Sequence, residues 1–241
     1  MWLSGNETEA TVSKILHPAR YAAVLPLQHE KMGMTSNSVL INQNAEIYSL
    51  VLHWPPSLRM ANDQFFDFCE ANRELRIERT AEGDCEIMTP TGGATGWRNS
   101  RLVTQLTIWA DLDGSGVVFD SSTGFFLPNG AIRSPDVSWV KKNRLAVLTS
   151  KQKKQFLPLC PDFVLELRSP SDTINVLHDK MQEYMANGSS LGWLIDPEMQ
   201  RVYVYQADQP VVKLDSPLSL TADEVVTGFK LELAKIWDVG F

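Results

Sequence analysis

The sequence has 241 residues, of which 44% are hydrophobic and 21% are charged, so it has the composition of a globular protein with a sizeable core. No apolar run approaches the roughly 20 residues that cross a bilayer, and the N-terminus lacks the basic start and apolar block of a signal peptide, which predicts a cytoplasmic protein. The formal net charge of −7 argues against binding nucleic acid through global charge. The three cysteines form no CxxC pair, so they support neither a disulfide framework nor a thiolate zinc site.

Regular patterns begin only after about residue 54, because the segment before it shows no long helical or alternating pattern. A helix is expected to begin at Asn62 or Asp63, since the apolar residues that follow recur with a period of 3.6. The next segment, "LRIERTAEGDCEIMTP", predicts two strands around a turn at Gly83. Glu78 lies in the first of these strands.

The rest of the chain alternates between strand and helix patterns. A second helix is expected from about Thr95 to the turn "DGSG", and the strand patterns "GVVFD", "TGFFLP" and "AIRSPDVSWV" follow it. After the basic segment "KKNRLAVLTSKQKKQF" come the strand "DFVLEL", a helix from about Thr173 to Asn187, and the strands "LGWLID" and "RVYVYQ". Strands interleaved with helices predict an α/β fold in which a mixed sheet is covered on both faces.

Two charges interrupt the apolar strand "DFVLEL". Because successive side chains of a strand point to opposite faces, Glu166 and Arg168 share one face with Val164. A buried carboxylate without a partner is very costly, so Glu166 requires a cation, a metal or water beside it. An ion pair between Glu166 and Arg168 is one interpretation, and a functional site is the other.

Two further residues favour a functional site. Asp136 stands at the start of the strand pattern "SPDVSWV", where aspartate is disfavoured, although an isolated aspartate there is usually a cap or turn residue. Lys180 lies at the edge of the apolar stripe of its helix, where it either keeps its ammonium in water or reaches the carboxylates of the preceding strand. Two carboxylates and an ammonium suit Mg²⁺-dependent hydrolysis of a phosphodiester, since Mg²⁺ prefers oxygen ligands and a lysine can orient the attacking water.

Five segments occur in an order that resembles a known family: "RIERTAEGD", "RSPDVSWV", "CPDFVLELRSPSD", "KMQEYMANGSSLGWLIDP" and "RVYVY". They resemble a cyanobacteria-rich family of restriction-endonuclease-like proteins, formerly a domain of unknown function, in the PD-(D/E)XK nuclease superfamily. The resemblance runs from about Met60 to Trp237. It implies a restriction-endonuclease-like, three-layer α/β/α core with a central mixed β-sheet. It also implies an N-terminal extension, partly irregular, at residues 1–58 and a restriction-endonuclease-like domain at residues 59–241.

The same resemblance implies roles for individual residues. Asp136 and Glu166 are the expected metal ligands, and Glu78 is the expected additional catalytic acid. The superfamily's usual lysine, two residues after the second acid, is here Arg168, which cannot act as a base but can bind phosphate. Lys180, in the helix that follows, is the expected catalytic lysine.

These roles predict an enzyme that hydrolyses phosphodiester bonds, a DNA endonuclease that depends on Mg²⁺ or Mn²⁺. A homodimer is the simplest arrangement for cutting both strands. The pI near 5.1 and the arginine at the usual lysine position leave a second hypothesis, a catalytically inactive nuclease-fold module that binds nucleic acid or a protein partner. A third hypothesis is a purely structural acid cluster.

The basic segment between the two acidic strands also has two interpretations. Its charged residues are Lys141, Lys142, Arg144, Lys151, Lys153 and Lys154. A solvated surface segment is the commoner structure for such a run. Phosphate contacts that flank a nuclease site are the alternative.

Overall fold

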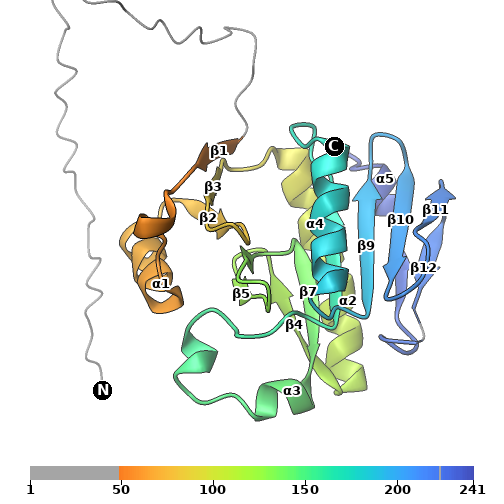
Figure 1. The fold of residues 1–241 in the computed structure, drawn as a ribbon. Coiled ribbons are helices and arrows are strands. Elements are labelled where there is room, and N and C mark those ends of the chain that lie inside the picture. The colour runs from red at the N-terminus through yellow and green to blue at the C-terminus, as the bar shows by residue number, and fades with distance from the viewer. Residues whose placement is uncertain (1–48, 223) are drawn as a thin grey trace, which may run out of the picture. The chain divides into compact units, whose positions relative to one another are not determined.

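A six-stranded mixed sheet forms the centre of the structure, a computed structural model that describes residues 49–222 and 224–241. Its strand order is β11-β10-β9-β8-β7-β4 (Figure 1). β8 and β9 run parallel, and the other neighbouring strands are antiparallel. The strands are β4 (Gly116–Asp120), β7 (Val137–Lys141), β8 (Phe163–Leu167), β9 (Leu191–Asp196), β10 (Arg201–Gln206) and β11 (Val212–Asp215).

Helices cover both faces of this sheet. α4 (Ile174–Ala186) packs on one face, and α2 (Gly93–Asp113) and the short α5 (Ala234–Trp237) lie on the other. The side chains of β8 alternate as predicted, because Leu165 joins the core on the α2 side and Val164 joins the core on the α4 side. The predicted three-layer α/β/α architecture is therefore confirmed.

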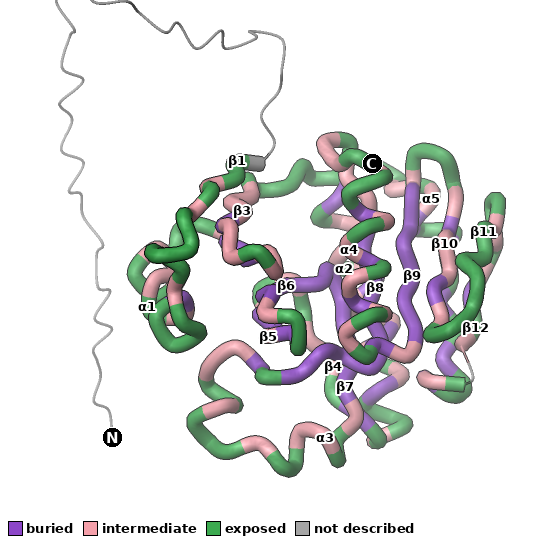
Figure 2. The backbone as a smooth tube through the Cα atoms, in the orientation of Figure 1, coloured by how far each residue is buried: buried purple, intermediate pink, exposed green. Residues whose placement is uncertain are grey.

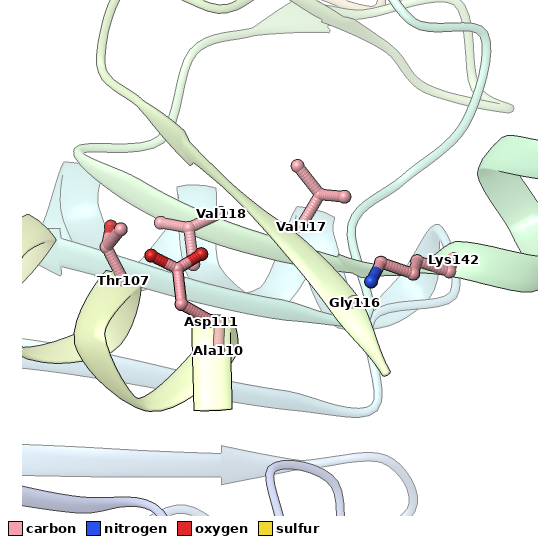
Figure 3. A pocket seen from close by; sticks show the side chains of 7 residues that line it. All are labelled: Thr107, Ala110, Asp111, Gly116, Val117, Val118 and Lys142. Atoms are coloured by element: carbon pink, nitrogen blue, oxygen red, sulfur yellow. The ribbon is translucent and has the colours of Figure 1, made fainter. Parts of the chain in front are cut away.

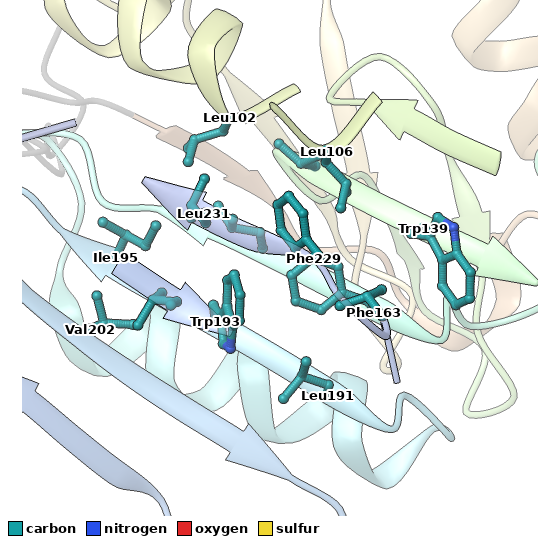
Figure 4. Packing of buried hydrophobic residues seen from close by; sticks show 14 of the residues in the cluster. Leu102, Leu106, Trp139, Phe163, Leu191, Trp193, Ile195, Val202, Phe229 and Leu231 are labelled. Carbon is teal, nitrogen blue, oxygen red and sulfur yellow. The ribbon is translucent and has the colours of Figure 1, made fainter. Parts of the chain in front are cut away.

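The core on the α2 side contains the buried aromatic rings of Trp139, Phe163, Trp193 and Phe229. Trp193 of β9 stacks on Phe229 at a ring-centroid distance of 6.0 Å, and Phe163 of β8 meets Trp193 edge-on at 5.0 Å. Figure 4 shows these rings beneath Leu102 and Leu106 of α2. β8 and β9 are buried along their whole lengths (Figure 2), as expected for a parallel pair that is covered on both faces.

A second sheet of five strands carries another part of the candidate site. Its order is β1-β3-β2-β6-β5, and α1 (Asn62–Ala71) packs against it through the fully buried Phe65. The strands are β1 (Ser49–Leu52), β2 (Arg76–Arg79), β3 (Cys85–Met88), β5 (Phe125–Phe126) and β6 (Ile132–Arg133). Gly83 makes the predicted β2–β3 turn with a φ of +94°, a conformation that glycine adopts without strain.

Several elements differ from the sequence predictions. The helices predicted from about residues 62, 95 and 173 are present as α1, α2 and α4, and the hairpin is present as β2 and β3. No element was predicted after β10, yet β11, β12 (Ser219–Thr221), β13 (Lys230–Glu232) and α5 are formed there. Short pieces also lie at η1 (Pro56–Leu58), α3 (Lys142–Ala146) and η2 (Gln152–Lys154).

The basic segment begins at the opposite end of the sheet from the predicted acids. Arg144 Nη1 lies 3.0 Å from Asp162 Oδ2, and Lys141 Nζ lies 3.9 Å from Asp162 Oδ1, just before β8 begins. Asp136 precedes β7, whereas Lys141 ends it, and five residues of strand span about 16 Å. These two basic residues therefore do not flank Asp136.

The predicted N-terminal extension falls mostly outside the described residues, which start at residue 49. Its last part includes β1, which pairs with β3, so residues 49–52 belong to the second sheet. The division into an extension and a domain at residue 58 stays a prediction. In the part of the chain that the structure describes, no helix has the length and apolar character needed to cross a bilayer.

Candidate active site

Glu78 lies in β2, with its carboxylate buried. Ser134 N donates a hydrogen bond to Oε1 at 3.0 Å, and Arg133 Nη1 donates to Oε2 at 3.3 Å. Lys180 Nζ lies 3.1 Å from Oε1. Burial raises the pKa of Glu78, but the charges of Lys180, Arg133 and Arg76 outweigh burial and bring the pKa below its ordinary value of 4.5. Glu78 is therefore an anion at neutral pH.

Glu166 lies near the end of β8, and its side chain faces α4. Tyr184 OH donates a hydrogen bond to Oε1 at 2.9 Å, and Lys180 Nζ lies 3.0 Å from the same oxygen. Burial raises the pKa of Glu166 to about 7; the charge of Lys180 opposes this rise, while the charges of Asp136 and Glu78 add to it. A carboxyl group with this pKa changes its protonation state near neutral pH.

Lys180 connects the two sheets through these carboxylates. Leu177, Met181 and Tyr184 form the buried stripe of α4, and the position of Lys180 beside this stripe sends its ammonium inward. Burial lowers the pKa of Lys180, but the charges of Glu166 and Glu78 have the larger effect and raise the pKa to about 12. Lys180 is therefore a cation and a hydrogen-bond donor at neutral pH, and its ammonium does not extend into water.

Asp136 is tied to the strand that carries Glu166. Its Oδ2 accepts a hydrogen bond from Leu167 N at 2.9 Å, and its Oδ1 accepts one from Asn99 Nδ2 of α2 at 3.3 Å. Burial raises the pKa of Asp136, whereas the hydrogen bond from Leu167 and the charge of Arg76 lower it. Glu78, Asp136, Glu166 and Lys180 thus belong to one buried cluster, although they are distant in sequence.

Arg168 does not join this cluster. Its Nη1 lies 3.1 Å from Asp196 Oδ2 and 2.9 Å from Glu198 Oε2, and its Nε donates to the carbonyl oxygen of Asp172 at 3.3 Å. Within residues 49–222 and 224–241, Arg168 makes no ion pair with Glu166. The interpretation of the two charges as a Glu166–Arg168 pair is therefore wrong, because acids at the end of β9 and in the turn after it take up the guanidinium.

Comparison with known proteins identifies the family. Residues 62–234, well over half of the chain, match the Uma2 family, which is described as "Putative restriction endonuclease". The chain belongs to the Uma2 family. This membership confirms the resemblance that the sequence motifs predicted. No protein in the curated collection matches the chain.

The fold of this Uma2 chain is also found in solved structures. One is a crystal structure described as "a putative nuclease belonging to DUF820 from Anabaena variabilis ATCC 29413", with a TM-score of 0.62 and 19% sequence identity. The match covers 74% of this chain and 97% of the other. At this identity the comparison shows a shared fold, and it agrees with the predicted restriction-endonuclease-like core.

Some residues around the acids were not singled out by the sequence patterns. Arg133 Nε donates to Glu183 Oε2 at 2.6 Å, and Arg133 Nη1 contacts both Glu78 and Glu86. Tyr184 matched the apolar stripe of α4, but its hydroxyl reaches Glu166. The position of Arg133, three residues before Asp136, was the available signal; its acidic partners come from other elements of the Uma2 fold.

The residues present fit a divalent cation. Asp136 and Glu166 supply hard oxygen atoms, and Mg²⁺ usually takes one or two carboxylates and keeps several waters. Asn99 Oδ1 is buried without a hydrogen-bond partner, and the amide nitrogen of the same side chain contacts Asp136. Among the described residues, no three His, Cys, Asp or Glu side chains are grouped so that together they could hold a metal ion. A bound cation would therefore depend on water as well as on these two acids.

A cavity of about 240 Å³ lies elsewhere in the Uma2 fold. Figure 3 shows its lining, which comes from α2, from β4 and from Lys142. Ala110 and Val118 of this lining belong to the core on the α2 side, whereas Glu166 faces α4 across the sheet. The cavity is therefore separate from the acidic cluster.

Proposed function

We propose that this Uma2 chain is a Mg²⁺-dependent DNA endonuclease that hydrolyses phosphodiester bonds. The observation that carries the proposal is the position of Lys180 Nζ, 3.1 Å from Glu78 and 3.0 Å from Glu166. Asp136 adjoins this pair, because its carboxylate binds the backbone N–H of the residue after Glu166. Family membership supports the same class of enzyme.

Each residue has a distinct role in this proposal. Asp136 and Glu166 would hold Mg²⁺ or Mn²⁺, which when bound would polarise a phosphoryl oxygen and activate a water. Tyr184 and Lys180 both bind Oε1 of Glu166, and no residue that the structure describes donates a hydrogen bond to its Oε2. Lys180 would orient the attacking water or neutralise developing charge as a protonated donor, since its pKa is about 12. Glu78 would hold that ammonium in place.

DNA cleavage with Mg²⁺ or Mn²⁺ tests this proposal. Glu166→Ala and Lys180→Ala should each reduce the rate at least about 100-fold, because one removes a metal ligand and the other a buried donor. Glu70→Ala and Lys230→Ala are matched controls, since both side chains are about half exposed on the surface, and they should cleave as the wild type does. Robust cleavage by Glu166→Ala would remove the proposed site.

One observation favours the alternative of an inactive nuclease-fold module. Lys180 Nζ already lies beside both Glu78 and Glu166, so a cation of the chain itself occupies a place between these acids where a metal could bind. Calorimetric titration with Mn²⁺ separates the two functions. Binding that Asp136→Asn abolishes supports the nuclease; no metal binding, together with metal-independent binding of DNA or a protein partner, supports the module.

A further inference from the structure

Two arginines lie near the acidic cluster, and they differ in whether a carboxylate closely contacts the guanidinium. Arg168, the arginine that the sequence motif assigns to substrate binding, has a side chain that is only 20% exposed. Its guanidinium contacts Asp196 and Glu198, and Asp196 is itself buried. Because Asp196 ends β9 and Arg168 directly follows β8, this ion pair ties the ends of two parallel strands together. Arg168 therefore has a structural partner for its charge.

Arg76 lies on β2, two residues before Glu78 and on the same face of the strand. Its side chain is 37% exposed, and Nη2 donates to the carbonyl oxygen of Ser134 at 2.7 Å. Its nearest acid, Glu78, lies at 4.0 Å and already has closer contacts with Lys180 and Arg133. Nε is buried and has no hydrogen-bond partner among the described residues.

The charge of Arg76 acts on two of the site's acids. Burial raises the pKa of Asp136, and Arg76 is among the charges that oppose this rise. Arg76 also helps to lower the pKa of Glu78, after the larger effects of burial, Lys180 and Arg133. By geometry, Arg76 Nη2 lies 4.0 Å from Glu78 Oε1 and binds the carbonyl oxygen of Ser134, two residues before Asp136, while the side chain is 37% exposed.

We propose that Arg76, rather than Arg168, is the arginine that binds a backbone phosphate of the substrate at this site. The inference rests on the proposed nuclease function. A guanidinium offers five N–H donors in a planar fork that matches a phosphate, and the side chain of Arg76 is 37% exposed, with its guanidinium 4.0 Å from its nearest carboxylate. The contact would place a phosphodiester beside Glu78 and the segment that carries Asp136, because Arg76 lies 4.0 Å from Glu78 and binds the carbonyl oxygen of Ser134.

The salt dependence of DNA binding tests this assignment. Fluorescence anisotropy of a labelled 20-base-pair duplex is measured in EDTA over a range of NaCl concentrations, for wild type, Arg76→Gln and Arg168→Gln. Loss of one phosphate contact lowers the slope of log K against log[NaCl] by about 0.9. Arg76→Gln should show this decrease and bind several-fold more weakly, with a melting temperature near that of wild type. Arg168→Gln should keep the wild-type slope and melt at a lower temperature.

DNA cleavage by the wild type with Mn²⁺ distinguishes failure of the Arg76 assignment from failure of the proposed nuclease function. If the wild type binds and cleaves DNA but Arg76→Gln keeps the full slope, the assignment of Arg76 is overturned and the nuclease function stands. A reduced slope in Arg168→Gln alone would return the role to Arg168. If the wild type neither binds nor cleaves DNA, the nuclease proposal and the assignment fall together. Arg76→Lys should recover part of the affinity, because it restores the charge but not the fork.

Discussion

Glu78 and Glu166 contact the same lysine, yet their pKa values shift in opposite directions. Burial raises the pKa of both residues, but Glu78 is also held by Arg133, Arg76 and the backbone N–H of Ser134. Glu166 receives less compensation and is repelled by Asp136 and Glu78, so that its pKa rises to about 7. Because Glu78 is already stabilised as an anion, its role is to hold the ammonium of Lys180 in place. The ionised form of Glu166 is the less stabilised of the two, so an added cation would stabilise Glu166 more.

Replacing each glutamate by glutamine should therefore change stability with opposite signs. The folded pKa of Glu166 lies above its ordinary 4.5, so its contribution to stability is fully present below about pH 4.5 and is lost as pH rises to about 7. Glu166→Gln should consequently stabilise the metal-free protein at pH 8, by about 1–3 kcal/mol. Glu78 has a lowered pKa and contributes stability above pH 4.5, so Glu78→Gln should destabilise the protein at pH 8.

Urea unfolding at pH 8 and at pH 4.5, with EDTA present, measures both changes. The stabilisation by Glu166→Gln should shrink at the lower pH, since the wild-type carboxyl is then protonated in the folded state. Equal destabilisation by the two substitutions at pH 8 would contradict the opposite shifts.

The faces of β8 could be predicted at the level of single residues, but the partner of Arg168 could not. Strict alternation in "DFVLEL" places Glu166 on the face of Val164 and opposite Leu165 and Leu167, and the structure confirms this placement. Alternation carries no information about the neighbouring strand. Asp196 meets Arg168 only because β9 pairs in parallel with β8, and that pairing depends on the whole sheet.

At the scale of elements, the close approach of α4 to β9 positions Lys180 and Tyr184. Gly192 of β9 permits this approach, because a Cβ there would lie 2.4 Å from Met181 Cε and 3.1 Å from Met185 Cε. Met181 is fully buried, so it has little room to move. A Cβ at position 192 would therefore force the buried end of the Met181 side chain to move.

Gly192→Ala should destabilise the fold by about 1–2 kcal/mol, because overpacking displaces the buried methionines. Gly96→Ala is the control, since a Cβ at Gly96 in α2 meets no atom within 4 Å, and alanine there should stabilise the helix by about 0.5–1 kcal/mol. Denaturant unfolding of both variants measures the changes. A neutral Gly192→Ala variant would show that α4 does not depend on this contact.

Long periodic elements could be predicted from the sequence, whereas short edge elements could not. α1, α2 and α4 have a helical apolar period, and β8 and β9 are mostly apolar. β11 is mostly exposed along its length, and β12 and β13 have three residues each, so their patterns are too short or too polar to predict a strand. These strands form because the adjacent strand along the chain completes their hydrogen bonds: β11 pairs with β10, and β12 pairs with β13.

At the scale of the whole molecule, the candidate site draws on both sheets and on α2 and α4. Glu78 comes from the second sheet, Glu166 from the main sheet, Lys180 from α4, and Asn99 of α2 contacts Asp136. The family motifs indicated which acids to examine, but their convergence is a property of the folded chain. The central claim is that Asp136 and Glu166 share one cation at this junction.

A crystal structure of the protein soaked in Mn²⁺, with anomalous diffraction recorded, tests that claim most directly. We expect one strong anomalous peak at about 2.0–2.3 Å from carboxylate oxygens of both Asp136 and Glu166, and no such peak at this position in Glu166→Gln. A Mn²⁺ peak bound by other residues, with none beside these two acids, would contradict the account.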